Sequence, residues 1–156
     1  MRRGTPLTTL LAVLALAGCG GEDPEAPAAC FNGADAYLTA LEDAPGEVRL
    51  EGVTPISDCL TDGQSGGDLG QVSQQVIEVA TRLNAEARRD PSGEATVELG
   101  YLVGAIQEGA STTGGIHRDL VLRLDTAARF TRGGGAPPVE FERAFGKGYA
   151  AGQATG

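Results

Sequence analysis

Residues 94–110 read EATVELGYLVGAIQEGA, and this stretch decides the fold that we expect for the chain. Its apolar side chains recur every three or four residues, which is the spacing of one face of an α-helix. They are Ala95, Leu99, Leu102, Val103, Ile106 and Ala110. Gly100 and Gly104 each cost up to about 1 kcal/mol relative to alanine inside a helix. A backbone-to-backbone contact with another helix would offset that cost, whereas the glutamates of the stretch exclude a transmembrane pair.

The preceding stretch, residues 68–89, carries the same apolar period. Its helical face consists of Val72, Val76, Val79, Ala80, Leu83 and Ala87. Asp68 and Gln71 fit a capping box, which predicts that this helix begins at Asp68. Asp90 and Pro91 then predict the cap and the first position of the next helix.

The segments after residue 110 indicate two further helices. Gly114 and Gly115 interrupt the chain, and a third apolar stripe consists of Ile116, Leu120, Leu124 and Ala127. In the last segment an aromatic stripe and a small-residue line share one helix, with members Phe141, Phe145, Tyr149, Ala144, Gly148 and Gly152. With a short helix expected at 34–44, these segments predict an all-α fold, a small antiparallel bundle of four to five helices.

The N-terminus has the features of a secretory signal, with two arginines, an apolar run from Leu7 and small residues before Cys19. The sequence Leu16-Ala17-Gly18-Cys19 resembles the lipobox of bacterial lipoprotein precursors. This resemblance implies a lipid on the Cys19 sulfur and cleavage before that residue. An alternative is a secretory signal whose cysteine is incidental. A transmembrane anchor fits less well, because the apolar run is shorter than the roughly 20 residues needed to span a bilayer.

We therefore expect residues 1–18 to be a lipoprotein signal peptide and 19–29 to be a lipidated cysteine with a flexible tether. Residues 30–156 would form one helical domain. Acyl chains on Cys19 would attach the protein to the extracytoplasmic side of the cytoplasmic membrane or to the outer membrane. Export by the general secretory route or by the twin-arginine route stays open.

The other two cysteines, Cys30 and Cys59, are expected to pair in an oxidising compartment. The loop that they close is worth roughly 3–4 kcal/mol by chain entropy. Two free buried thiols are the alternative. We expect no metal cofactor, because two cysteines and one histidine provide too few ligands for a zinc site.

The chain is acidic, with 21 Asp and Glu against 12 Lys and Arg and a net charge of −9. Removing Arg2 and Arg3 with the signal peptide would bring the charge to −11. Most of this charge lies in residues 20–69, which hold 11 acidic residues and one basic residue, Arg49. The balance argues against nucleic-acid binding and against electrostatic attachment to anionic lipid.

Two motifs suggest chemistry but lack the necessary context. Residues 63–67 match G-x-S-x-G around Ser65, with Asp90 and His117 following in hydrolase order, yet no apolar strand precedes them. We expect a flexible acidic loop there. Asp58, Asp62 and Asp68 are weak candidates for a calcium site, since Leu60 and Leu69 occupy ligand positions of the usual loop.

The function that we expect is that of a membrane-tethered extracytoplasmic lipoprotein with a non-catalytic role, in binding or in envelope structure. An envelope protein is the expected partner. The alternative is an enzyme or a calcium-binding protein whose site is assembled from scattered residues, with Glu94, Glu98 and His117 as candidates.

Overall fold

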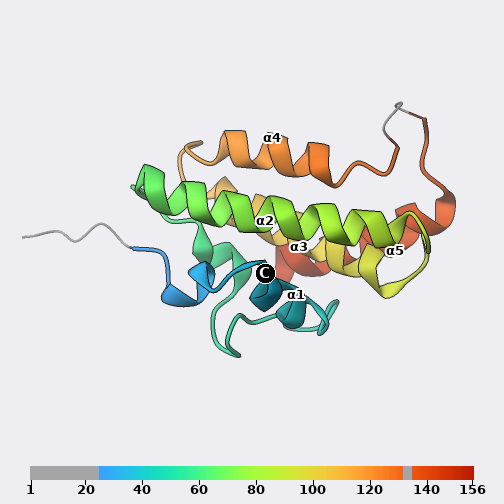
Figure 1. The fold of residues 1–156 in the computed structure, drawn as a ribbon, viewed down its shortest axis with the longest axis horizontal. Helices are drawn as coiled ribbons and strands as arrows, with labels where there is room; N and C mark the ends of the chain where they lie inside the picture. The colour runs from blue at the N-terminus through green and yellow to red at the C-terminus, as the bar shows by residue number, and fades with distance from the viewer. Residues whose placement is uncertain (1–24, 132–134) are drawn as a thin grey trace, which may run out of the picture.

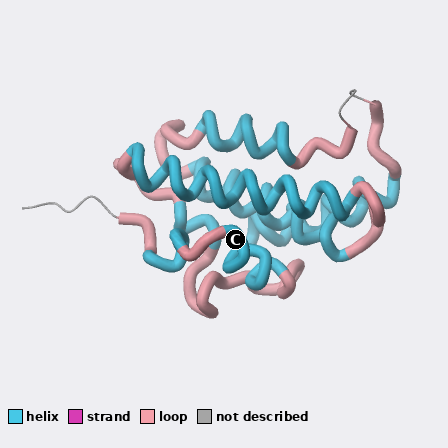
Figure 2. The backbone as a smooth tube through the Cα atoms, viewed as in Figure 1, coloured by secondary structure: helices cyan, strands magenta, loops and turns pink. Residues whose placement is uncertain are grey.

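A computed structural model of the chain describes residues 25–131 and 135–156 and shows a helical domain. Its helices are α1 (Ala34–Leu41), α2 (Gly66–Ala87), α3 (Glu94–Ser111), α4 (Arg118–Ala127) and α5 (Val139–Thr155), with short 3-10 helices η1 (Ala28–Phe31) and η2 (Ile56–Cys59). The described residues contain no strand, only an isolated bridge between Leu50 and Thr54 (Figure 2). The expected all-α fold of four to five helices is confirmed, with five α-helices in the described residues.

Helix α3 is the centre of the domain. It contacts α1, α2, α4, α5 and η2, and it lies behind α2 in Figure 1. Its residues 99–106 are all buried, so this helix is apolar around most of its circumference rather than along one stripe. A helix of that kind is stable only when other helices surround it. The periodic face predicted for residues 94–110 is therefore one part of a larger buried surface.

Helix α5 packs against α3 through glycines on both helices. A Cβ atom at Gly100 would lie 2.1 Å from the Phe145 carbonyl oxygen, and one at Gly148 would lie 1.8 Å from that of Val97. Gly104 and Gly152 meet the opposing backbone in the same way. Small residues four apart allow two helix backbones to approach closely. The expected backbone contact of Gly100 and Gly104 is thus present, and α5 provides its other side.

The α3–α5 pair is parallel, although consecutive long helices run in opposite directions (Figure 1). Gly100 of α3 lies beside Phe145 of α5, and Gly104 lies beside Tyr149, so the residue numbers of both helices increase in the same direction. The intervening helix α4 runs back along the domain and makes this parallel pairing possible. The tightest contact of the bundle is therefore between helices that are not neighbours in the sequence.

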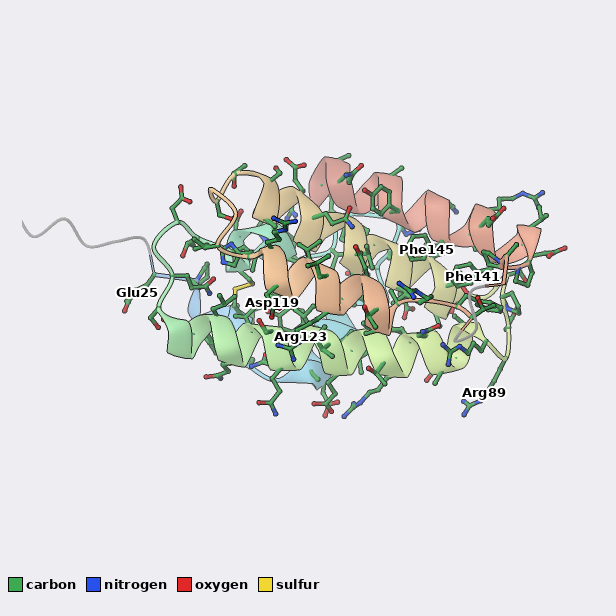
Figure 3. The ribbon with its side chains drawn as sticks, turned by 90° about the horizontal axis from the view of Figure 1, so that it is seen from above. Glu25, Arg89, Asp119, Arg123, Phe141 and Phe145 are labelled. Atoms are coloured by element: carbon green, nitrogen blue, oxygen red, sulfur yellow. A yellow bond between two sulfur atoms is a disulfide. The ribbon has the colours of Figure 1, made fainter. Side chains whose placement is uncertain are left out.

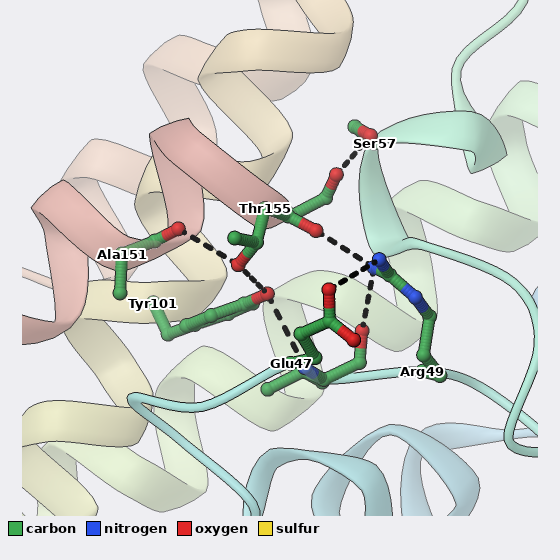
Figure 4. A network of polar contacts seen from close by, with 8 residues as sticks. Glu47, Arg49, Ser57, Tyr101, Ala151 and Thr155 are labelled. Carbon is green, nitrogen blue, oxygen red and sulfur yellow. Dashed lines mark hydrogen bonds and ion pairs between the residues drawn. The ribbon is translucent and has the colours of Figure 1, made fainter.

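The last turn of α5 is attached to the acidic N-terminal part of the domain by hydrogen bonds (Figure 4). The Arg49 guanidinium donates to the Thr155 carbonyl at 2.7 Å, and the Tyr101 and Thr155 hydroxyls are 2.9 Å apart. The Ser57 hydroxyl donates to the Gly156 carbonyl oxygen. The bonds from Arg49 and Ser57 satisfy carbonyl groups at the end of α5 that have no partner within the helix, and the Tyr101 hydroxyl joins the same turn to α3.

The expected disulfide between Cys30 and Cys59 is present and joins η1 to η2. Both cysteines are buried, and the Tyr37 hydroxyl donates to the Cys30 carbonyl at 3.0 Å. Val48, Leu50 and Ile56 also enter the core, whereas Val53 at the tip of the same segment is 73% exposed. The irregular segment before α2 is therefore pinned to the bundle by a covalent bond and by buried side chains.

Two helix starts differ from the sequence predictions. Helix α2 begins at Gly66, and the Ser65 side chain caps it by accepting a hydrogen bond from the Asp68 amide at 3.1 Å. Asp68 therefore lies inside the first turn, where its charge complements the helix dipole. Helix α3 begins after Gly93 rather than at Pro91, because Asp90 bonds to the amide and hydroxyl of Ser92 and holds a turn.

The packed domain begins before Cys30. Ala26 and Ala29 are buried, so part of the segment expected to be a flexible tether lies against the bundle. The expected signal peptide, Cys19 and residues 20–24 lie outside the described residues. Within the described part of the chain, no helix is both long and apolar enough to cross a lipid bilayer.

Replacing Gly148 by alanine tests the contact between α3 and α5. The new methyl would overlap the Val97 carbonyl, so we expect G148A to lower the free energy of unfolding by at least about 2 kcal/mol. Gly146 lies on the same helix with no atom within 4 Å of its would-be Cβ. We expect G146A to raise stability by up to about 1 kcal/mol through helix propensity. Urea unfolding followed by circular dichroism measures both, and equal effects of the two variants would contradict the packing described.

Candidate functional site

A hollow of about 400 Å³ lies at the segment that joins α4 to α5, and we call it the α4–α5 hollow. Two of its lining residues, Phe141 and Phe145, are labelled in Figure 3. Its lining residues are Val103, Asp125, Ala128, Arg129, Phe130, Thr131, Gly135, Pro137, Phe141 and Phe145. The hollow exists because α4 and α5 both pack on α3 but scarcely touch each other. Its lining is mostly apolar, and its two charged residues are Asp125 in α4 and Arg129 just after that helix. This is the usual composition of a surface that binds an apolar group.

One wall of the hollow is formed by the aromatic rings of Phe130, Phe141 and Phe145, and Tyr149 extends the row beyond it. The ring centroids of Phe130 and Phe141 are 4.5 Å apart, those of Phe141 and Phe145 are 5.5 Å apart, and Tyr149 follows at 6.2 Å. Phe141 is buried, but Phe130, Phe145 and Tyr149 remain partly exposed. Of the aromatic stripe of α5, Phe141 is therefore core, whereas Phe145 and Tyr149 pack against the core with part of each ring at the surface.

Polar bonds fix the end of this aromatic row. The Tyr149 hydroxyl donates to Gln107 Oε1 at 2.6 Å, and Gln107 Nε2 donates to Asp125 at 3.1 Å. These two hydrogen bonds link α5 to α3 and α3 to α4. Asp125 and Arg129 then supply one negative and one positive side chain at the rim. The hollow can therefore receive an apolar side chain. Asp125 and Arg129 at its rim can form ion pairs with a positive or a negative group that lies beside that side chain.

His117, the candidate catalytic residue, is buried in a structural network. It is 0% exposed, and its ring lies between Thr113 Oγ1 at 2.6 Å and Gln64 Oε1 at 2.7 Å. Gln64 Nε2 donates to the Cys59 carbonyl, so its carbonyl oxygen faces the ring and His117 Nε2 carries the donated proton. Burial lowers the pKa of His117, against the effect of the nearby Asp62 carboxylate. A neutral ring with both nitrogens engaged ties α4 to the disulfide-bonded segment.

Glu98 lies in a different part of the domain from His117. From Glu98 to its end at Ser111, α3 advances about 20 Å at helical rise, and Thr113, which bonds His117, lies just beyond that end. Burial, and then the carboxylates of Glu86, Glu94 and Glu42, raise the pKa of Glu98 to about 7. The structure therefore brings Glu98 near Glu94 but does not bring either residue to His117.

The serine of the G-x-S-x-G motif also has a structural role. Ser65 is the cap of α2, and its hydroxyl accepts from the Asp68 amide. Asp90, the second residue of the motif order, bonds to Ser92 at the opposite end of the same helix. The two residues are thus separated by the length of α2, and the triad suggested by their order does not form.

The three calcium candidates do not form a cluster. Among residues 25–131 and 135–156, no three histidine, cysteine, aspartate or glutamate side chains lie close enough together to hold a metal ion. Asp58 and Asp62 are exposed in the segment before α2, while Asp68 occupies the first turn of that helix. The acidic residues of this segment therefore act as separate solvated charges.

Comparisons with known proteins provide no relative for this chain. No protein-family model, no curated protein and no solved structure matches it.

Replacing Glu98 by glutamine tests the acidic cluster. Because the folded pKa of about 7 exceeds the ordinary value of 4.5, ionised Glu98 destabilises the fold above pH 7. That penalty disappears as the pH falls below 4.5, where the carboxyl is protonated in both states. We expect E98Q to be more stable than the wild type by about 1 kcal/mol at pH 8, after allowance for solvent screening of this half-buried group. The difference should vanish at pH 4.

Thermal unfolding at the two pH values measures this effect. Glu108 is an exposed carboxylate further along the same helix and provides the control E108Q. A gain in E98Q that is the same at pH 4 and pH 8 would contradict the assignment.

Proposed function

We propose that this chain is a membrane-tethered extracytoplasmic lipoprotein that acts by binding another molecule rather than by catalysis. The α4–α5 hollow carries the binding part of the proposal, because partly exposed aromatic rings line it. Aromatic side chains with one buried and one exposed face are common at the centre of protein interfaces. The expected partner is an envelope protein that presents an apolar side chain to this surface.

Attachment to the membrane rests on the lipobox that ends at Cys19. The buried Cys30–Cys59 disulfide supports an exported location, since such bonds persist mainly in oxidising compartments. The charge of the mature chain gives no attraction to anionic lipid, so acyl chains would provide the attachment.

The structural roles of His117 and Ser65 support a binding role over the enzymatic alternative. Both ring nitrogens of His117 bond to side chains of the domain, and the Ser65 hydroxyl caps α2. A general base needs a nitrogen that can reach the substrate, and a nucleophile needs an adjacent base.

Lipid attachment is tested by expressing the full chain in a bacterial host supplied with an alkyne-bearing fatty acid. We expect the wild type to incorporate the label and to partition into the detergent phase, and C19S to lose both properties. G20S changes the neighbouring residue without removing the sulfur and should behave like the wild type. An unlabelled wild-type protein in the aqueous phase would refute the tether.

The binding surface is tested by placing a photoreactive phenylalanine analogue at position 145 in intact cells. We expect one envelope protein to crosslink from this position, because Phe145 lines the hollow and is partly exposed. The same analogue at exposed Glu108, outside the hollow, is the control and should not capture that protein. Equal crosslinking from both positions would contradict the assigned surface.

A further inference from the structure

A second hollow of about 390 Å³ lies on the other side of α4, and we call it the α2–α4 hollow. It is lined by Thr81, Asn84, Ala85, Arg88, Thr126, Ala127 and Arg129. Two of these residues carry guanidinium groups, and none carries a carboxylate. The hollow is therefore a locally positive place in a chain with a net charge of −9.

The two threonines of the hollow are restricted to accepting hydrogen bonds. Thr81 Oγ1 donates its proton to the Ile77 carbonyl at 2.7 Å, and Thr126 Oγ1 donates to the Leu122 carbonyl at 2.9 Å. A hydroxyl has one proton, so each threonine has only lone pairs left for a ligand.

The Asn84 side chain can also only accept a further hydrogen bond, and it is almost completely buried. It is 3% exposed, and Nδ2 donates to the Ala127 carbonyl at 2.6 Å and to the Arg129 carbonyl at 3.0 Å. These two acceptors fix the orientation of the amide and use both of its protons. Oδ1 is left buried with no hydrogen-bond partner among the described residues. An unsatisfied buried acceptor costs about 1–3 kcal/mol, so a donor at this point would be stabilising.

The guanidinium groups supply the complementary donors. Arg88 uses Nε on the Phe130 carbonyl and Nη2 on the Arg129 carbonyl, both at 2.7 Å. Its remaining N–H groups, three of the five that a guanidinium carries, are available to a ligand. The side chain of Arg129 is exposed at the same hollow. Guanidinium groups bind carboxylates through paired charge-assisted hydrogen bonds.

We propose that the α2–α4 hollow binds a small carboxylate that also carries hydroxyl groups, such as a sugar acid. The carboxylate pairs with Arg88 and Arg129, and the hydroxyl groups donate to Asn84 Oδ1 and to the threonine oxygens. A hydroxyl donor suits the site better than an ammonium group, because two guanidinium groups and no carboxylate surround it. The proposal is independent of the lipid anchor, and of its two guanidinium groups only that of Arg129 also lines the α4–α5 hollow.

Three probes of matched size separate the parts of this proposal. Gluconate carries a carboxylate and hydroxyl groups, hexanoate carries only the carboxylate, and sorbitol carries only the hydroxyl groups. We expect gluconate to bind the mature chain at one saturable site, at least tenfold more tightly than either other probe, by calorimetry at low ionic strength. Equal binding of gluconate and hexanoate would reveal an unspecific anion site and overturn the proposal, as would the absence of saturable binding.

Variants locate the site. R129Q removes an exposed guanidinium, and we expect at least tenfold weaker gluconate binding. T81V removes a hydroxyl acceptor that belongs to this hollow and not to the α4–α5 hollow, and we expect binding to weaken several-fold. R123Q, which changes an exposed arginine of α4 outside the hollow, should bind like the wild type. Unchanged binding in both R129Q and T81V, with the fold intact by circular dichroism, would refute the assignment.

Discussion

The close approach of the α3 and α5 backbones is the constraint on which the rest of the domain depends. The glycines at this contact leave no room for a methyl group on either side. Because the two helices are parallel, their dipoles are aligned side by side, which is a mildly unfavourable arrangement. The packing of one backbone on the other has to outweigh that repulsion and the low helix propensity of the glycines. It also keeps α5 on α3 and largely out of contact with α4, and the α4–α5 hollow forms where the two helices separate.

The sequence predicted what depends on local spacing. The helical stripes, the Cys30–Cys59 pair and the need for a backbone contact at Gly100 follow from residue types and intervals along the chain. Neither the partner of that contact nor its parallel direction could be predicted, because both depend on the path of α4. The cap of α2 is Ser65 rather than the predicted Asp68. Both residues are good N-caps and lie three positions apart, so the sequence alone offered two starts for the same helix.

The candidate sites were harder to predict for the same reason. His117 was a catalytic candidate through its place after Ser65 and Asp90, and the sequence could not show that its partner is Gln64, 53 residues away. The two hollows depend on how α4 lies against α2 and α5, and no pattern of residues along the chain specifies that arrangement. Asn84 belongs to a predicted helix, yet its importance comes from two carbonyl groups at the end of α4. Polar side chains that connect elements distant in the chain are thus the part of this structure that local patterns cannot specify.

Under the proposed lipid attachment at Cys19, the positions of Glu25 and of the α4–α5 hollow would set how the domain is oriented at the membrane. Glu25 lies at one end of the domain and the labelled rings of Phe141 and Phe145 lie toward the other (Figure 3). Six residues join Cys19 to Glu25, so the covalent reach from a lipidated cysteine to the domain is at most about 20 Å. With so short a linker to the lipid, the domain would be oriented with its Glu25 end toward the bilayer. The α4–α5 hollow would then face outward, within reach of a molecule approaching from the opposite side of the envelope space.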